Sequence, residues 1–247
     1  MDRRDFLKKG GLFLVGAPMG AYLLRVLPAT GAKASSGGAT SQTRWGMVID
    51  LHKCLDDCNA CVESCRRENN VALHGDERWD VYWLRKVDIE SEQFAGSGTE
   101  SVPLLCNHCD EPPCALVCPV QATYKREDGI VIVDHHRCIG CRYCMIACPY
   151  NARFFNYKEN HDWHNKDYPK RSHGVAEACN FCAHRLDDGR LPACVETCQS
   201  IAGALTIGDL NDPHSEVSRL ITDNPVKRLR DDFGTEPKVY YIGLPGR

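Results

Sequence analysis

The chain has 247 residues and a formal net charge of −3, and its composition excludes several classes of protein. Residues 1–34 carry six Lys or Arg and two Asp or Glu, so residues 35–247 are acidic, with 24 basic and 31 acidic side chains. An acidic body argues against nucleic acid as a partner, and the composition is not that of a disordered chain or a coiled coil. The 16 cysteines outnumber the seven phenylalanines more than twofold, so burial must come partly from whatever the cysteines hold.

The N-terminus is typical of an export signal. Arg3 and Arg4 are followed, after one residue, by an apolar pair, which resembles the twin-arginine (Tat) signal. Residues 10–27 are only moderately apolar and include Arg25, so they are a poor membrane span, and residues 32–34 offer a small-x-small cleavage site. We predict a cleavable twin-arginine signal peptide over 1–34, a linker over 35–43 and a periplasmic location. A basic amphipathic helix is the alternative.

The first cysteine motif follows a predicted strand over 45–50. Its members are Cys54, Cys58, Cys61 and Cys65, and a short helix is expected from Cys61 to Arg67. No cysteine occurs in residues 71–103, which we interpret as an inserted β region with a strand over 79–89 and a flexible loop over 96–98. The Trp and Tyr residues of 79–83 fit the packing of that sheet, and a docking surface is the alternative.

The second and third motifs share an ending in which three residues separate the last two cysteines and proline follows. The second consists of Cys106, Cys109, Cys114 and Cys118, and the third of Cys138, Cys141, Cys144 and Cys148. The third has the C-x2-C-x2-C-x3-C-P spacing of bacterial ferredoxins, whose first three thiolates bind one iron–sulfur cluster and whose fourth binds the neighbouring cluster. Residues 122–134, with Asp128 and Gly129 at their centre, predict a β-hairpin between the two motifs.

Crossed ligation follows for both pairs of motifs. Cys118 is expected to complete the cluster of Cys138, Cys141 and Cys144, and Cys148 that of Cys106, Cys109 and Cys114. The fourth motif, Cys179, Cys182, Cys194 and Cys198, would alone fit a zinc site nearly as well. As the partner of the first motif it gives one set of Cys54, Cys58, Cys61 and Cys198, and one of Cys65, Cys179, Cys182 and Cys194.

Histidines near these motifs leave two interpretations open. A polar insertion over 158–173 contains His161, His164 and His173, whose irregular spacing argues against a metal or haem site. His108, His135 and His136 lie beside cysteines and fit either hydrogen-bond donors that tune a cluster or solvent-exposed side chains.

The predicted fold is α+β, with two bacterial-ferredoxin-like units of the βαβ type, each pseudo-twofold, organised around four clusters. The outer unit comprises 44–70 and 174–247, the inner unit 104–157, with the inserted β region and long loops between them. Towards the C-terminus we expect a polar turn over 208–213, a helix over 215–221 and a strand over 238–242. No stretch after the leader approaches the roughly 20 apolar residues needed to span a bilayer.

Residues 44–242 resemble the four-cluster electron-transfer subunits of iron–sulfur molybdoenzymes and related respiratory complexes, such as polysulfide, tetrathionate and dimethyl sulfoxide reductase beta subunits. The four motifs, residues 107–114, residues 137–141 and residues 208–213 carry this resemblance. Members with a 3Fe–4S centre lack one cysteine, so the sixteen cysteines here imply four 4Fe–4S clusters. A leader of its own and the widened first motif resemble most the DsrO type of the DsrMKJOP sulfur-metabolism complex, followed by the hydrogenase-linked HybA and HmcB types.

This resemblance implies an electron-transfer subunit that is not itself an enzyme. It would pass single electrons between a membrane-integral, quinone-reactive subunit of the NrfD type and a further redox subunit, a cytochrome c or a catalytic subunit, and would be held at the membrane by these partners. The sequence shows no nucleotide-binding glycine loop, nucleophile elbow or spare thiol. A disulfide-rich secreted protein, a zinc scaffold and a stand-alone iron–sulfur reductase are the rival classes, and the first two do not explain four C-x2/3-C motifs.

Overall fold

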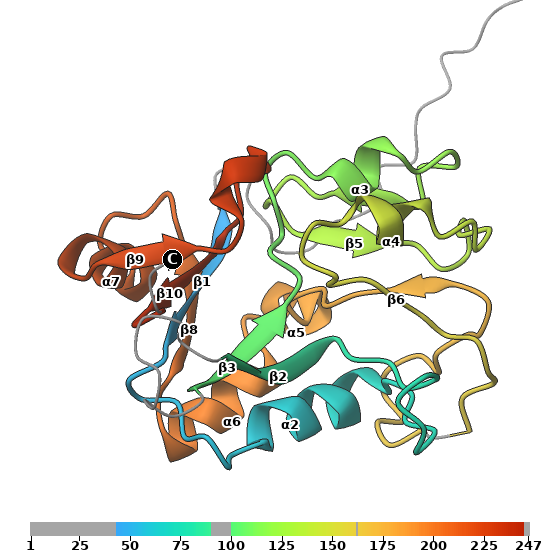
Figure 1. Ribbon diagram of the computed structural model, residues 1–247, viewed down its shortest axis with the longest axis horizontal. Coiled ribbons are helices and arrows are strands. Elements are labelled where there is room, and N and C mark those ends of the chain that lie inside the picture. Colours follow the sequence, from blue (N-terminus) through green and yellow to red (C-terminus); the bar gives the residue numbers. More distant parts are fainter. Residues whose placement is uncertain (1–42, 90–99, 162, 245–247) are drawn as a thin grey trace, which may run out of the picture. The chain divides into compact units, whose positions relative to one another are not determined.

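The computed structural model describes residues 43–89, 100–161 and 163–244, whose strands form one four-stranded sheet and three two-stranded sheets (Figure 1). Short helices and loops that carry the cysteines connect these sheets. The predicted leader, nearly all of the linker and the loop over 96–98 lie outside the described residues. Within those residues, no helix has both the length and the apolar character needed to cross a bilayer.

The four-stranded sheet brings the start and the end of the described chain together. Its order is β8 (Leu205–Asp209), β1 (Trp45–Asp50), β10 (Val239–Ile242) and β9 (Val226–Arg228). β1 pairs in parallel with β10 and antiparallel with β8, and its Met47, Val48 and Ile49 are all buried because both faces of the sheet are covered. The strands predicted over 45–50 and 238–242 are confirmed.

Helix α7 (Glu216–Asp223) covers one face of this sheet against β8 and β1. It begins after Ser215, whose Oγ accepts a hydrogen bond of 3.1 Å from the Ser218 N–H, as expected of an N-cap serine. The helix predicted over 215–221 is therefore confirmed. The polar turn predicted over 208–213 starts later, because Gly208 and Asp209 still pair with β1 as the end of β8.

Helix α2 (Ala60–Asn69) confirms the helix predicted from Cys61 and packs against α6 (Ala193–Ile201), while the shorter α5 (Ala183–Asp187) precedes α6 in the chain. Asn70 ends α2 in the left-handed region, with φ of 52°. Its side-chain amide donates to the carbonyl oxygens of Asn165 and Tyr168, at 2.9 and 3.0 Å. Asn70 thereby anchors the polar segment over 158–173 at the end of α2.

The inserted region forms a hairpin of β2 (Leu84–Ile89) and β3 (Glu100–Leu105). The predicted strand over 79–89 was too long, because residues 79–83 are irregular. The carboxylate of Asp80 accepts the backbone N–H groups of His74 and Gly75 and so holds a compact loop in place of a strand. The ring of Tyr82 packs on Phe154, at a centroid distance of 6.1 Å.

The middle of the chain carries short elements between the cysteines. The predicted hairpin is confirmed as β4 (Thr123–Lys125) and β5 (Val131–Val133). Helix α3 (Pro113–Leu116) precedes it and α4 (Tyr143–Ala147) follows it, and the two helices pack side by side (Figure 1). Strands β6 (Phe154–Phe155) and β7 (Ala176–Glu177) then form a short antiparallel pair.

A buried lysine joins these parts. The Lys238 side chain, at the start of β10, is fully buried, and its Nζ donates to Asp110 Oδ1 at 3.0 Å and to the Gly129 carbonyl oxygen at 2.6 Å. Arg44, just before β1, binds the second oxygen of the same carboxylate. Asp110 therefore links the residues that directly precede β1 and β10, and Lys238 links them to the turn of the β4–β5 hairpin.

Candidate metal centres

The structure places Cys54, Cys58, Cys61 and Cys198 around one small cavity, which we call the Cys54 set. Leu55 and Ile201 line the same cavity, and α2 and α6 bring its two sides together. Lys86 of β2 closes the loop from outside, because its Nζ donates to the carbonyl oxygens of Leu55, Asp56 and Cys58 at 2.6, 2.8 and 3.1 Å. The extra residue of the first motif is accommodated in a turn at Asp56 and Asp57.

Cys65, Cys179, Cys182 and Cys194 form a second group, the Cys65 set, and all four are buried. Burial raises the pKa of the Cys65 thiol well above its ordinary value, and the neighbouring thiols of Cys179, Cys182 and Cys194 raise it further. The amide of Asn69, one turn beyond Cys65 in α2, lies 3.4 Å from Cys182 Sγ and 3.8 Å from Cys65 Sγ. The Asn69 amide therefore donates hydrogen bonds to sulfur atoms of two cysteines that lie far apart in the sequence, Cys65 and Cys182.

Cys106, Cys109, Cys114 and Cys148 line another small cavity and form the Cys106 set. A buried arginine accompanies them: Arg153 Nη2 donates to Cys114 Sγ at 3.1 Å, and Nη1 donates to Thr123 Oγ1 at 3.0 Å. Burial by itself lowers the pKa of this guanidinium, but the thiols of Cys114, Cys106, Cys144 and Cys148 raise it above its ordinary value. The positive charge of Arg153 is therefore directed at sulfur.

The remaining cysteines, Cys118, Cys138, Cys141 and Cys144, lie on or next to α3 and α4 in the chain, and we call them the Cys118 set after the predicted ligation. Cys138 and Cys144 are close enough for the Cys138 thiol to raise the pKa of Cys144, although burial is the larger cause. Burial raises the pKa of Cys118 too, but the backbone N–H groups of residues 120–123 outweigh it and hold this pKa below its ordinary value. Gly140 has φ of +70°, and a Cβ there would lie 2.5 Å from the Gly174 carbonyl oxygen, so the turn between Cys138 and Cys141 requires glycine.

These four sets are neighbours in a fixed order. Cys61 of the Cys54 set raises the pKa of Cys194 in the Cys65 set. Cys106 of the Cys106 set does the same to Cys179 of the Cys65 set, and Cys114 of the Cys106 set to Cys144 of the Cys118 set. The order is therefore Cys54 set, Cys65 set, Cys106 set, Cys118 set.

Two rings fill the junction between the two middle sets. His108, between Cys106 and Cys109, lies with its ring centroid 3.7 Å from that of Phe181, which lies between Cys179 and Cys182. His108 is fully buried, which rules out the solvent-exposed alternative, and its Nδ1 accepts the Val131 N–H at 3.0 Å. Burial holds the pKa of His108 well below its ordinary value, so the ring is neutral and its proton is on Nε2.

The donor set fits iron–sulfur clusters. All sixteen cysteines are free of disulfides, and buried thiols of this kind carry raised pKa values, about 11 for Cys61 and about 12 for Cys106, because burial disfavours an isolated thiolate. Soft thiolates select iron–sulfur clusters, zinc or copper(I). Among the described residues no three His, Cys, Asp or Glu side chains converge on a point that a single metal ion would occupy. Each set offers the four thiolates that a cubane takes, and no disulfide competes for them.

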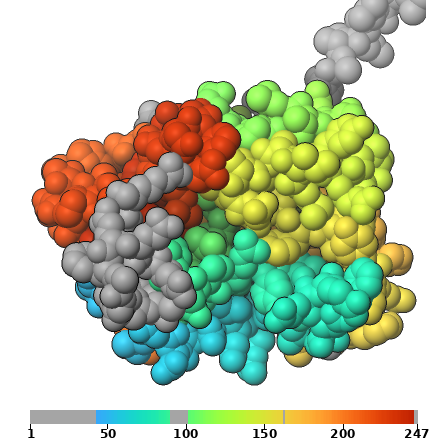
Figure 2. Space-filling model, viewed as in Figure 1, coloured from blue at the N-terminus to red at the C-terminus, as the bar shows by residue number. Residues whose placement is uncertain are grey.

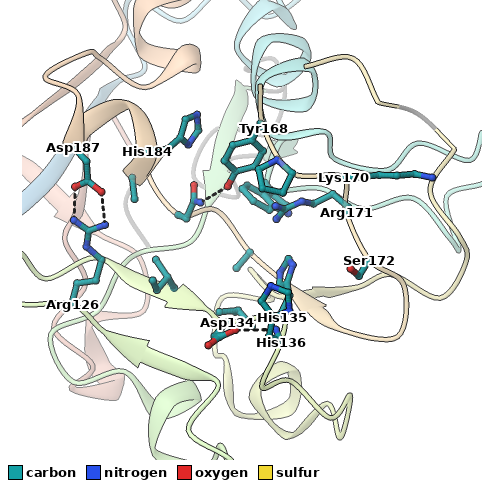
Figure 3. A pocket seen from close by; sticks show the side chains of 17 residues that line it. Arg126, Asp134, His135, His136, Tyr168, Lys170, Arg171, Ser172, His184 and Asp187 are labelled. Carbon is teal, nitrogen blue, oxygen red and sulfur yellow. Dashed lines mark hydrogen bonds and ion pairs between the residues drawn. The ribbon is translucent and has the colours of Figure 1, made fainter. Parts of the chain in front are cut away.

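The histidines of the polar segment form no such centre: His161, His164 and His173 are all exposed. His135 and His136 line a separate cavity of about 450 Å³, together with Tyr168 and Arg171 (Figure 3). Figure 3 shows Arg126 and Asp187 paired at one side of this cavity, at 2.5 Å between Nη2 and Oδ1. Since none of its lining residues is a cysteine, the cavity adds no thiolate to the four sets.

Sequence reasoning missed the side chains that surround the sulfurs. Arg153, Asn69, Lys86 and Phe181 all act across long sequence separations, which a motif does not record. One signal was present: Arg153 interrupts an otherwise apolar run between Ala152 and the Phe154–Phe155 pair, as expected of a buried arginine with a dedicated partner.

Comparison with known families identifies the class. The family model of the 4Fe-4S dicluster domain matches residues 98–210, a range that includes all of the second and third motifs. Together with the thiol sets, this match defines an iron–sulfur protein with ferredoxin-type binding of 4Fe–4S clusters.

Full-length relatives narrow the class. The chain is 40% identical to the Hdr-like menaquinol oxidoreductase iron–sulfur subunit 1 of Archaeoglobus fulgidus, over 100% of this chain and 99% of the relative. It is 39% identical to the B subunit of the tetrathionate reductase of Salmonella typhimurium, over 98% and 88%. The menaquinone reductase iron–sulfur cluster-binding subunit of Nitratidesulfovibrio vulgaris is 37% identical, over 81% and 88%. The chain belongs to this family of 4Fe-4S ferredoxin-type iron–sulfur subunits, and it is an electron-transfer subunit of an oxidoreductase complex, not its catalytic subunit.

Proposed function

We propose that the sixteen cysteines hold four 4Fe–4S clusters with crossed ligands, in two ferredoxin-like units, and that the clusters form one conducting row. The observation that carries this proposal is the order of the four thiol sets, in which each set lies beside the next. The first and fourth motifs contribute to two adjoining sets, and the second and third motifs to the other two, as two nested units require.

The burial of the cysteines along the row supports a role in electron transfer, whichever direction the electrons take. Every cysteine of the Cys65 set and three of the four in the Cys106 set are buried, whereas Cys54, Cys58 and Cys198 at one end and Cys118, Cys138 and Cys141 at the other are partly exposed. When bound, each cluster takes up and releases single electrons, with a potential set by charge, hydrogen bonds and solvent exposure. This chain excludes water from the middle of the row and leaves both ends accessible to partners.

We propose that the row connects a membrane quinone pool with a second redox subunit in the periplasm. Two of the similar proteins are named for menaquinol or menaquinone, which supports a quinone-reactive membrane subunit of the NrfD type at one end. A cytochrome c or a catalytic subunit would then receive or supply electrons at the other. Our preferred assignment is the self-exported DsrO type, which acts in sulfur metabolism. The alternative is a beta subunit of a hydrogenase or molybdoenzyme complex, of the HybA or PsrB type. The likeness to the tetrathionate reductase protein supports this alternative.

Cluster content and ligation test the first part. Anaerobically purified protein should contain iron and acid-labile sulfide that each approach four per cysteine set, and stoichiometric zinc with little iron would refute the proposal. Cys118→Ser should perturb the same electron paramagnetic resonance signal as Cys138→Ser. If Cys118→Ser instead changed the signal that responds to Cys109→Ser, the crossed assignment would be wrong.

Export and membrane attachment test the second part. Replacing Arg3 and Arg4 together by lysine should leave cluster-loaded protein in the cytoplasm, and undiminished periplasmic protein would contradict a twin-arginine route. Deleting the proposed membrane-integral subunit of the NrfD type should release soluble protein that carries its clusters into the periplasm. Retention in the membrane without that subunit would show that the leader stays attached as an anchor.

A further inference from the structure

The most exposed large apolar side chains of the described residues gather at one end of the row. Ile146 is 83% exposed, Leu116 81%, Ile139 64% and Tyr143 58%, and every other large apolar side chain described is less exposed than these four. We call these four residues the α3–α4 patch. A scattered exposed leucine needs no explanation, but contiguous exposed apolar side chains mark an interaction site.

The four residues lie on or beside α3 and α4, and these two helices pack side by side (Figure 1). Tyr143 and Ile146 are three positions apart on α4 and share one face of it, Leu116 ends α3, and Ile139 lies in the turn between Cys138 and Cys141. Figure 2 shows the green and yellow-green side chains of this region forming an outer surface.

The charges around the patch are basic. The segments that carry it, 113–125 and 134–148, contain Lys125, Arg137 and Arg142 against Asp134, which pairs with Arg137 at 3.4 Å, and the exposed Glu111 lies just before α3. Asp110 adds no free negative charge because it pairs with Arg44, Lys125 and Lys238. The opposite end of the row has the reverse character, because residues 50–63 contain Asp50, Asp56, Asp57 and Glu63 against Lys53 and the Lys86 that binds this loop. The two ends therefore differ in the sign of charge that they present to a partner.

We propose that the α3–α4 patch is the docking surface for a redox subunit whose contact face has an apolar centre and a rim of carboxylates. This inference rests on the proposed function, since it assigns a partner to one end of the row. The apolar centre would bury the four side chains beside the partly exposed Cys118, Cys138 and Cys141, and the basic rim would steer and orient an acidic face. Two copies facing each other through this patch would bring two faces with the same sign of charge together and repel. An anionic lipid surface would match the charge but would exchange no electrons with the row.

Substitution in the intact complex tests the surface. Ile146→Glu and Leu116→Glu should each reduce recovery of the native complex, isolated from membranes through a tag on this chain, by at least tenfold. Phe233→Glu, at an exposed aromatic residue of the 3₁₀ helix over Asp231–Phe233, is the matched control and should leave recovery unchanged. Equal recovery of the Ile146→Glu complex and the control would overturn the proposal.

Cross-linking identifies the occupant. A photoreactive benzoylphenylalanine at position 146 of the native complex should cross-link to an acid-rich segment of another subunit. Cross-links only to residues 50–63 of a second copy would show head-to-tail self-association, and cross-links only to lipid, or none, would likewise overturn the docking assignment. Two measurements on the isolated chain, its iron content and its reduction by a small redox dye, test the proposed function separately from the docking surface. Loss of clusters in the unsubstituted protein refutes the wire, whereas intact clusters with unaltered assembly refute only the docking surface.

Discussion

Replacing Arg153 should lower the reduction potential of the cluster bound by the Cys106 set. Arg153 is buried, and its Nη2 lies 3.1 Å from Cys114 Sγ, so its charge stabilises the extra electron of a reduced cluster. If that electron is spread over a cluster about 6–7 Å from the guanidinium, an effective dielectric constant of about 20 gives about 2.5 kcal/mol. For a one-electron couple, this energy corresponds to about 100 mV.

The assay is a redox titration of Arg153→Gln followed by electron paramagnetic resonance. We expect one centre, identified by its response to Cys114→Ser, to move to a lower potential by about 100 mV, with a smaller decrease for the Cys118 set because Cys144 is also near Arg153. Arg153→Lys retains the charge and should shift the potential much less, and Arg78→Gln, at an exposed arginine, should leave all centres unchanged. An equal shift in the lysine and glutamine variants, or no shift in either, would refute the electrostatic reasoning.

Three further changes test other parts of the structure. Asp110→Asn leaves Lys238 buried without its carboxylate and should lower the free energy of unfolding by about 3–5 kcal/mol, measured by urea denaturation, while Asp212→Asn at an exposed turn should not. Asn69→Leu removes a donor to Cys182 Sγ and should lower the potential of the Cys65 set alone; a shift of the centre sensitive to Arg153 would contradict the assignment. Gly140→Ala should cost the protein one cluster, read as a loss of about a quarter of the bound iron, because the new Cβ meets the Gly174 carbonyl oxygen; full iron content would show that this turn can move.

The spacing of the cysteines predicted more of the fold and of the candidate site than composition or periodicity did, because the ligands of a cluster must come from short loops. The spacing led to crossed ligation as a prediction. The structure places Cys198 at a cavity with three cysteines of the first motif and Cys148 at one with three of the second, while ligation of clusters stays a prediction. Strands β1 and β10, the β4–β5 hairpin and helix α7 were predicted from short stretches of local sequence, and these predictions are confirmed.

The errors and omissions arose where long-range contacts decide the structure. Residues 79–83 have the composition of a strand, but the Asp80 carboxylate captures backbone N–H groups and the aromatic rings pack on residues near 155, so no strand forms. On the molecular surface, teal residues near 75 and yellow residues near 155 lie together (Figure 2). The partner of Arg153 is a thiol 39 positions away, a relation that no single motif contains.

The nested arrangement that we propose for the sets would constrain how the protein is made. Asn69 and Cys182, which share a hydrogen bond beside the Cys65 set, are 113 positions apart in the chain. At about 5–20 residues per second, the thiols of the first motif therefore wait roughly 6–23 seconds for Cys182 of the fourth motif to be synthesised. During that interval they are open to oxidation and to the wrong metal, whereas the second and third motifs emerge close together. Slowing translation between the third and fourth motifs should thus deplete iron from the Cys54 and Cys65 sets and spare the other two.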